Sequence, residues 1–404
     1  MNPRYLFCII LFICLSQTGY SQIIPWRNLL NRQQTQQQIP TIEVNPSRIS
    51  YGNVRLSDII ESIEYIPLET TDESLVGGVG FSPRSFDISD NYIVVSCRMQ
   101  TQVFLFSRDG RFIRRIGRQG QGPGEYTGVF GVFIDEGRNR IFVMGSHYQE
   151  GALIYNLTTG EFVENIPRER GQGSPDRLHN DHFLTSNDVS IVFPFVYQIS
   201  NLDFQLVAEN IQSHFYRFTT MRSLVIMGRP TNYLFNDKIH VRKMALNDTL
   251  FAIESDFSFT PRFVVSAGRL SPTMNSITAH PPSQERRQRY VKIGSIYQTT
   301  NKLLFQYDFQ GRTRFTYFDK NTERLFHFRS ESGIPNDFDG GVDFWPRRQD
   351  NLIWYQFFDA YYLIENSGGI TPTGGAAAVQ SFNRLIERLD PDDNPVLMIV
   401  RLKE

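Results

Sequence analysis

Residues 102–116 read QVFLFSRDGRFIRRI, and this stretch contains the pattern that decides the fold. An apolar segment at 102–107 is followed by the turn Arg108-Asp109-Gly110 and then by a second apolar segment at 111–116. Glycine adopts a positive φ without steric cost, so an Asp-Gly turn between two such segments predicts a β-hairpin. We therefore expect antiparallel strands joined by tight turns.

The same arrangement recurs along the chain, and helical periodicity is confined to 57–62 and 379–389. Further strands are expected at 92–97, 140–144, 152–156, 161–166, 314–318 and 324–328. Short strands that repeat in units of about 40 to 60 residues are typical of a β-propeller. Six blades of roughly 60 residues fit the length, seven also fit, and a β-sandwich is the competing all-β architecture.

The first 21 residues have the features of a secretory signal peptide. Arg4 precedes the 11-residue apolar run YLFCIILFICL, which is too short to span a membrane. Gly19 and Ser21 supply small residues before a cleavage site at Gln22. We therefore expect an exported protein, periplasmic or extracellular, with no transmembrane segment. Lipid anchoring at Cys14 is not expected, because the bulky Ile13 precedes it.

The mature chain would retain only Cys97, so no internal disulfide is expected, and its apolar segment predicts a buried, inert thiol. Residues 22–43 include the Gln-rich stretch NRQQTQQQIP and are predicted to be a linker before a folded part at 44–404. The formal net charge of −1 gives no reason to expect a nucleic-acid partner. We expect a monomer.

Five stretches resemble a family of secreted six-bladed β-propellers of Bacteroidetes, which is related in shape to NHL-type propellers. They are LSDIIESIEYIPLET (56–70), FLFSRDGRFIRRIGRQGQGPGEY (104–126), NDTLFAI (247–253), IPNDFDGGVDFWP (334–346) and DDNPVLMIVRL (392–402). The resemblance implies one propeller of four-stranded antiparallel blades and no assigned biochemical function. Many members have a clear lipoprotein cysteine, which this chain lacks. Strands at 63–68 and 396–402 are expected to share one blade and so to close the propeller.

The segment 117–126 (GRQGQGPGEY) has two interpretations. Its glycines, with Arg118, suggest a backbone cradle for an anion. The spacing fits neither G-x-G-x-x-G nor a P-loop, and no helix is expected to follow. A crossing between blades, where the backbone needs positive φ and close approach, is therefore the favoured interpretation.

Two other polar segments contain residue types that bind metals. Asp337, Asp339 and Asp343 surround a glycine pair and suggest calcium, but the EF-hand pattern is not met, and an acidic turn is the alternative. His179 and His182 lack the third ligand and general base that catalytic zinc needs. We therefore expect no cofactor, with calcium as the one alternative.

Trp345 lies beside acidic and basic residues, as in many sugar-binding surfaces, although Trp is also a common core residue. Trp354, within IWYQFF, is expected in the core. Loops at one end of the central channel would form the binding site. The candidate residues are Arg118, Glu125, Tyr126, Asp337, Asp339, Trp345 and Arg347.

The first functional hypothesis is a non-catalytic binding or scaffold propeller. Its ligand class, by analogy with the family's setting, would be carbohydrate, and another envelope protein is the alternative partner. The second hypothesis is a carbohydrate-active hydrolase or lyase that uses carboxylates at the channel mouth. The third is a protein-interaction platform, which would expose a broad apolar patch.

Overall fold

The computed structural model describes residues 39–77, 84–97, 100–145, 151–168, 175–186, 195–211, 232–242, 249–273 and 288–404. The predicted signal peptide and residues 22–38 of the predicted linker lie outside these ranges. No helix in the ranges given is long and apolar enough to cross a membrane.

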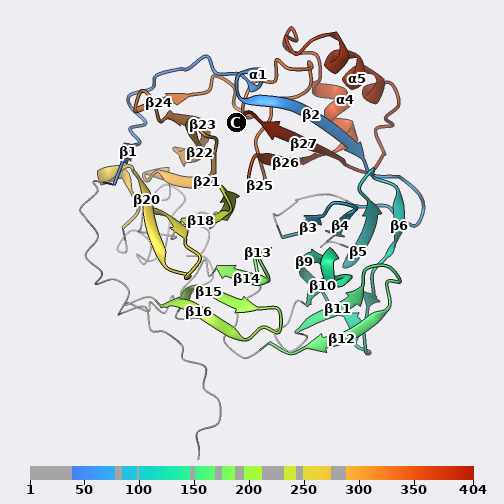
Figure 1. Cartoon of the computed structure of the whole chain (residues 1–404). Helices are drawn as coiled ribbons and strands as arrows, with labels where there is room; N and C mark the ends of the chain where they lie inside the picture. The colour runs from blue at the N-terminus through green and yellow to red at the C-terminus, as the bar shows by residue number, and fades with distance from the viewer. Residues whose placement is uncertain are drawn as a thin grey trace, which may run out of the picture.

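The fold is all-β and propeller-like, and its small antiparallel sheets lie around a common centre (Figure 1). Four of the sheets contain four strands each, and within each sheet neighbouring strands are consecutive in sequence. The first two sheets are β3 (Phe86–Ile88), β4 (Tyr92–Cys97), β5 (Gln102–Ser107) and β6 (Phe112–Arg115), and β9 (Val129–Asp135), β10 (Arg140–Gly145), β11 (Ala152–Asn156) and β12 (Phe162–Ile166). The other two are β13 (Arg177–His179), β14 (His182–Ser186), β15 (Phe195–Asn201) and β16 (Leu206–Ile211), and β21 (Lys292–Gln298), β22 (Lys302–Phe309), β23 (Arg312–Asp319) and β24 (Arg324–His327).

A nine-stranded sheet contains two further antiparallel groups of four strands. One group is β17 (Asn232–Phe235), β18 (Lys238–Arg242), β19 (Thr249–Ile253) and β20 (Phe259–Ser266), and the other is β25 (Arg348–Asp350), β26 (Ile353–Phe358), β27 (Val396–Leu402) and β2 (Ile60–Pro67). A single parallel pair, Leu234 opposite Asp350, joins the groups. β2 and β27 pair antiparallel, from Ile60 opposite Leu402 to Pro67 opposite Val396, although they lie near opposite ends of the chain.

The predicted hairpin at 102–116 is confirmed as β5 and β6. Gly110 has a φ of 91° and donates its amide to the carbonyl of Ser107 at 2.9 Å. A Cβ at this position would lie 2.1 Å from the carbonyl oxygen of Pro67. Glycine is therefore required both by the turn and by the close approach of the neighbouring strand β2.

The core consists of layers between neighbouring sheets. Side chains of β4 point alternately toward the two neighbouring sheets: Ile93 belongs to the same hydrophobic cluster as Leu397 of β27, whereas Val94 belongs to the same cluster as Ile141 of β10. A strand buried on both faces has a continuous apolar sequence without a polar alternation, which explains YIVVSC. Cys97 is buried, as predicted, and so is Trp354.

The start of the folded part differs from the prediction. The last three residues of the predicted linker, Thr41–Glu43, form β1, which pairs parallel with β20, and the side chains of Ile42 and Val44 are buried. The chain then reaches β24, where the amide of Gly52 donates to the carbonyl of His327 at 3.0 Å. Gln-rich composition predicts a linker but cannot show where the edge strand begins.

The helical predictions are only partly confirmed. The segment 57–62 forms the single turn α1 (Leu56–Ile59) and then continues as β2, because Ile60 begins the pairing with β27. The segment 379–389 overlaps α5 (Ala376–Ile386), which packs Phe382 against Tyr65. The helix α4 (Ala360–Asn366) was not predicted, and both α4 and α5 lie between β26 and β27 in the sequence.

Candidate ligand-binding pocket

The glycine-rich segment 117–126 crosses from one sheet to the next, between β6 and β9. Gly117 and Gly124 have φ angles of 61° and 72°. A Cβ on Gly117 would lie 2.4 Å from the hydroxyl of Tyr155, and one on Gly124 would lie 2.7 Å from the ring of Phe162. The segment therefore lies directly on β11 and β12, in agreement with the favoured interpretation as a crossing.

Three amides of this segment, those of Gly120, Gly122 and Glu125, donate within the segment itself. Gly122 donates its N–H to Oε2 of Glu125 at 2.8 Å, and Gly120 donates its N–H to the carbonyl of Tyr126 at 3.1 Å. An anion cradle needs several amides that are free to donate to a ligand. The structure therefore does not support the cradle interpretation.

Glu125 is held as an ionised carboxylate. Its Oε2 accepts from Gly122, and its Oε1 accepts from Nε of Arg118 at 2.6 Å. The hydrogen bond from Gly122, followed by the one from Arg118, lowers the pKa of Glu125 below its usual value. The Glu125 side chain is 18% exposed, whereas that of Arg118 is 81% exposed. The pair thus places a carboxylate in the pocket wall and its partner on the outer surface.

Two tyrosine hydroxyls anchor the crossing segment. Tyr126 is buried and donates its hydroxyl to the carbonyl of Ile116 at 2.9 Å, and burial raises its pKa to about 12. Tyr155 donates its hydroxyl to the carbonyl of Gly124 at 2.8 Å. Of the three candidates in this segment, Glu125 lines a pocket, Arg118 supports it from outside, and Tyr126 lies beneath it.

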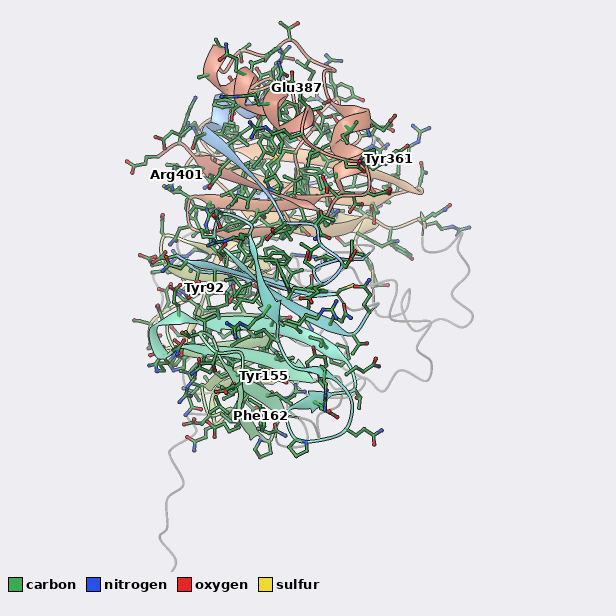
Figure 2. All side chains as sticks on the ribbon, turned by 90° about the vertical axis from the view of Figure 1, so that its right-hand side faces the viewer. Tyr92, Tyr155, Phe162, Tyr361, Glu387 and Arg401 are labelled. Carbon is green, nitrogen blue, oxygen red and sulfur yellow. The ribbon has the colours of Figure 1, made fainter. Side chains whose placement is uncertain are left out.

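The pocket beside this segment has a volume of about 400 Å³. Its lining residues are Gly120, Gln121, Gly122, Pro123, Gly124, Glu125, Thr127, Leu153, Phe162 and Asn165. Phe162 is 38% exposed, and its ring meets the ring of Tyr155 edge-on at 5.9 Å (Figure 2). This volume lies within the range of small-molecule sites, about 300 to 1,000 Å³.

A β-bulge contributes to this pocket. Phe162 lies opposite Tyr155 and Glu164 lies opposite Ile154, so Val163 has no residue opposite it. A bulge changes the direction in which neighbouring side chains point and interrupts the edge of a sheet. It lies between Phe162 and Asn165, both of which line the pocket together with Leu153 of the adjacent strand.

The second group of candidates holds loops and helices in place. Asp337 is buried and accepts from the amide of Ser57 at 3.0 Å and from its hydroxyl at 2.8 Å. Asp337 also accepts from the hydroxyl of Thr373 at 3.1 Å. This carboxylate thus ties the start of α1 to the loop that precedes α5.

Asp339 and Asp343 also bind within the protein. Asp339 accepts from the amide of Gly341 and from the side chain of Asn336, both at 2.9 Å, and burial raises its pKa. Asp343 accepts from the hydroxyl of Ser332 at 3.1 Å. Within the ranges that the structure describes, no three His, Cys, Asp or Glu side chains come together as a metal site. The calcium interpretation of this segment is therefore not supported, and the acidic turn explains it.

Trp345 and Arg347 complete this group. Trp345 is buried, and its ring packs edge-on against Phe315 at 4.8 Å and Tyr297 at 6.2 Å. Arg347 is exposed. The residues 337–347 lie between β24 and β25, whereas 118–126 lie between β6 and β9, so the seven candidates belong to two separate segments.

The centre of the arrangement contains an axial cluster formed by Asp87, Arg177, Arg348, Gln349 and Asp350. Arg348 contacts Asp350 and Asp87, each at 2.7 Å, and Arg177 also pairs with Asp350. Gln349 is fully buried, accepts from the amide of Gln298 at 2.9 Å and donates to its carbonyl at 2.6 Å. β25 is thereby joined to β3, β13 and β21, which belong to three other sheets.

This cluster bears on the hydrolase hypothesis. A glycosidase needs one carboxylic acid whose pKa is raised so that it can donate a proton. Burial by itself would raise the pKa of Asp350, but the positive charges of Arg348 and Arg177 together outweigh this effect, so the pKa is lowered. Asp87 pairs with Arg348, and Asp176 pairs with Arg84. These axial carboxylates therefore have the environment of ion-pair partners and not of a general acid.

The sequence did not identify Phe162, Asn165 or Leu153 as site residues. They are distant in sequence from the glycine-rich segment, and only the packing of β11 and β12 under that segment brings them to it. One signal was available in the sequence: Phe162 and Val163 are adjacent in a predicted strand, whereas a strand with one buried face alternates apolar and polar residues.

Replacing Gly124 with alanine is expected to lower the free energy of unfolding by about 1 to 3 kcal/mol. The positive φ strains any L side chain, and the added methyl would meet Phe162. Denaturant unfolding measures the change. Gly137→Ala is the matched control, since its Cβ would meet no atom closer than 3.8 Å. Equal effects of the two substitutions would contradict the assigned packing.

The protein is thus all-β and propeller-like, with paired carboxylates in the axial cluster and with a pocket formed by the segment 120–127, Leu153, Phe162 and Asn165, called the rim pocket below. The chain belongs to a family described as a domain of unknown function, DUF4934, whose model matches residues 39–401. No curated protein matches the chain.

Two solved structures from Bacteroides are similar to the chain. One, from Bacteroides fragilis NCTC 9343, is described as a candidate exported protein; it is 16% identical, with a TM-score of 0.62 over 90% of this chain and 99% of that one. The other is a member of the DUF4221 family from Bacteroides vulgatus ATCC 8482; it is 10% identical, with a TM-score of 0.44 over 85% of this chain and 97% of that one. The first likeness shows a shared fold.

Proposed function

We propose that this protein is an exported, non-catalytic binding propeller of six blades. Four blades are the separate four-stranded sheets, and the two groups within the nine-stranded sheet are the other two. Pairing of β2 with β27 joins the two ends of the chain within one blade. Closure of this kind removes sheet edges that would otherwise aggregate. The protein acts as a monomer.

The observation that carries the binding function is the rim pocket. It combines an exposed aromatic ring, an ionised carboxylate and side-chain amides in one concave site. The axis, in contrast, is occupied by the axial cluster, whose carboxylates pair with arginines. Binding at the rim therefore agrees better with the geometry than does catalysis in a channel.

Export is supported by the features of residues 1–21 and by the similar fold of a protein described as a candidate for export. The site of action would be the periplasm or the cell exterior. Carbohydrate is the first ligand class to test, because a ring face stacks on sugar C–H groups while amides and carboxylates bind hydroxyls. In this pocket those groups are Phe162, Asn165 and Glu125.

The test is a thermal-shift screen of the protein against a panel of glycans. A ligand at about 100 times its Kd adds roughly 2.7 kcal/mol and raises the unfolding midpoint by several degrees. Phe162→Ala is expected to weaken binding of any hit at least about tenfold, because it removes the exposed ring. Tyr361→Ala, an aromatic residue on α4 that is 58% exposed and outside the pocket, is the control.

Binding that survives Phe162→Ala would place the ligand elsewhere and overturn the assignment of the pocket. A glycan that is converted into product would overturn the non-catalytic proposal. A thermal shift shown by the original protein and by Tyr361→Ala, but absent in Phe162→Ala, would support the assignment of the binding site to this pocket.

A further inference from the structure

The described lining of the rim pocket contains acidic but no basic side chains. Of the described residues that line it, Glu125 alone carries an ionisable side chain, and no lysine, arginine or histidine is among them. The amides of Gly120 and Gly122 are already donated within the loop. A ligand in the pocket therefore meets one ionisable group, the Glu125 carboxylate, whose ion-pair partner Arg118 lies outside the lining.

The carboxylate of Glu125 retains capacity for a further partner. A carboxylate has about four lone-pair positions, and Glu125 interacts with Arg118, with the amide of Gly122 and with the backbone of Gln121, which leaves one position for a ligand. Arg118 does not line the pocket and is 81% exposed, so it binds Glu125 from the solvent side. Exposed ion pairs are weak, and a cation that enters the pocket can share or replace this one.

The rest of the wall suits an organic cation. The ring of Phe162 is 38% exposed, and aromatic faces attract ammonium groups within about 6 Å of the ring centre. Leu153 and Pro123 supply apolar surface for a short carbon skeleton, and the amide of Asn165 supplies an acceptor. These groups come from the crossing segment and from β11 and β12, and the packing of Gly124 on Phe162 holds them together.

We propose that the rim pocket recognises a primary ammonium group on a short carbon skeleton, held between the Glu125 carboxylate and the Phe162 ring. An amino sugar and a lysine side chain both present this chemistry. The inference rests on the proposed function of the pocket and adds the charge class of its ligand. A ligand carrying a carboxylate or sulfate finds no cationic side chain in the lining to bind.

Isothermal titration calorimetry with four probes tests the inference. D-glucosamine and Nα-acetyl-L-lysine amide carry the ammonium group, N-acetyl-D-glucosamine is its neutral counterpart, and D-glucuronate is an anion. At least one ammonium probe is expected to bind about tenfold or more tightly than the neutral sugar, with no binding of the glucuronate. The two ammonium probes distinguish a sugar source from a peptide source. Binding should weaken as salt is added, because the contact is ionic.

Two substitutions give matched tests. Glu125→Gln keeps an acceptor for Gly122 but removes the charge, and it should abolish the preference for ammonium over neutral probes. Phe162→Leu keeps an apolar wall but removes the ring face, and it should weaken ammonium binding several-fold. Glu164→Gln removes a nearby exposed carboxylate of β12 that does not line the pocket, and it should leave the affinity for every probe unchanged. Thermal unfolding verifies that each variant is folded.

The outcomes separate this inference from the proposed function. If neutral and ammonium probes bind equally, and if Glu125→Gln leaves both unchanged, the charge class is wrong while the pocket remains a binding site. If only neutral glycans from the panel bind, and Phe162→Ala abolishes their binding, the proposed charge class is again wrong while the pocket remains a binding site. If neither the four probes nor the panel bind the folded protein, both are wrong.

Discussion

Deletion of β27 is expected to abolish cooperative folding. Five of its seven side chains, those of Val396, Leu397, Met398, Val400 and Leu402, are at most 1% exposed. Burial of such side chains contributes about 1.5 to 3 kcal/mol each, so their loss costs on the order of 10 kcal/mol. That is comparable to the whole stability of a domain, about 5 to 15 kcal/mol. The deletion also removes the partner of β2 on one side and of β26 on the other.

A variant that ends at residue 395 measures this effect by circular dichroism and denaturant unfolding. Arg401→Ala is the control within the same strand, because its side chain is exposed (Figure 2) and should change the free energy of unfolding by no more than about 0.5 kcal/mol. A sharp unfolding transition in the deletion variant, at an unchanged midpoint, would show that the sheets do not depend on this pairing.

Asp350→Ala is expected to lower the free energy of unfolding by about 3 to 5 kcal/mol. The substitution leaves Arg177 and Arg348 without their shared carboxylate, and their side chains are 5% and 12% exposed. Arg348 keeps its contact with Asp87, but Arg177 loses this ion pair, and an uncompensated buried charge is costly because the interior cannot replace its hydration. The cost should be large because this residue links β25 to β13 and also lies at the pairing with β17.

Denaturant unfolding measures this cost, with Asp181→Ala as the control. Asp181 pairs with Arg138 at 2.7 Å, but both side chains are about half exposed, so its loss should cost at most about 1 kcal/mol. Equal costs would contradict the assigned importance of the axial cluster.

The Asp350→Ala variant should also change how stability depends on pH. The folded pKa of Asp350 lies below its unfolded value of about 3.9, because Arg348 and Arg177 favour the charged form. Its contribution is therefore present above that unfolded value and is lost as the pH falls through the folded pKa. Acid titration of the original protein should show this loss below about pH 4, and the variant should show less of it. Parallel titration curves would contradict the assigned role.

Local patterns predicted much of the fold. The hairpin at 102–116 followed from an Asp-Gly turn between apolar segments, and Gly110 does adopt the required positive φ. The apolar run YIVVSC predicted a strand, which is β4. Such patterns are reliable because a strand buried on both faces needs apolar residues and a tight turn needs glycine. The start of the folded part was less predictable, because β1 is ordered by its pairing with β20 and not by its own composition.

The candidate site was only half predictable. The glycine-rich segment was recognised because four glycines and a proline in so few residues are unusual, and Glu125 does line the pocket. The acidic segment was predicted as a possible calcium site because three aspartates surround a glycine pair, but Asp337 binds Ser57 and Thr373, and Asp339 binds within its own turn. Short acidic turns have the same composition whether their carboxylates face a ligand or their own backbone. Whether such a carboxylate faces a ligand or its own backbone depends on how the turn is buried, and burial depends on the rest of the chain.

By itself the sequence determined many of the strands, the tight turns and the need for glycine at the crossing segment, because these depend on residues adjacent in the chain. Tertiary structure alone decided which strands meet, and so brought Phe162 and Asn165 to Glu125, and Arg177 and Arg348 to Asp350. Those contacts join residues up to 173 positions apart. No local pattern encodes them, because they result from burying every sheet face at once.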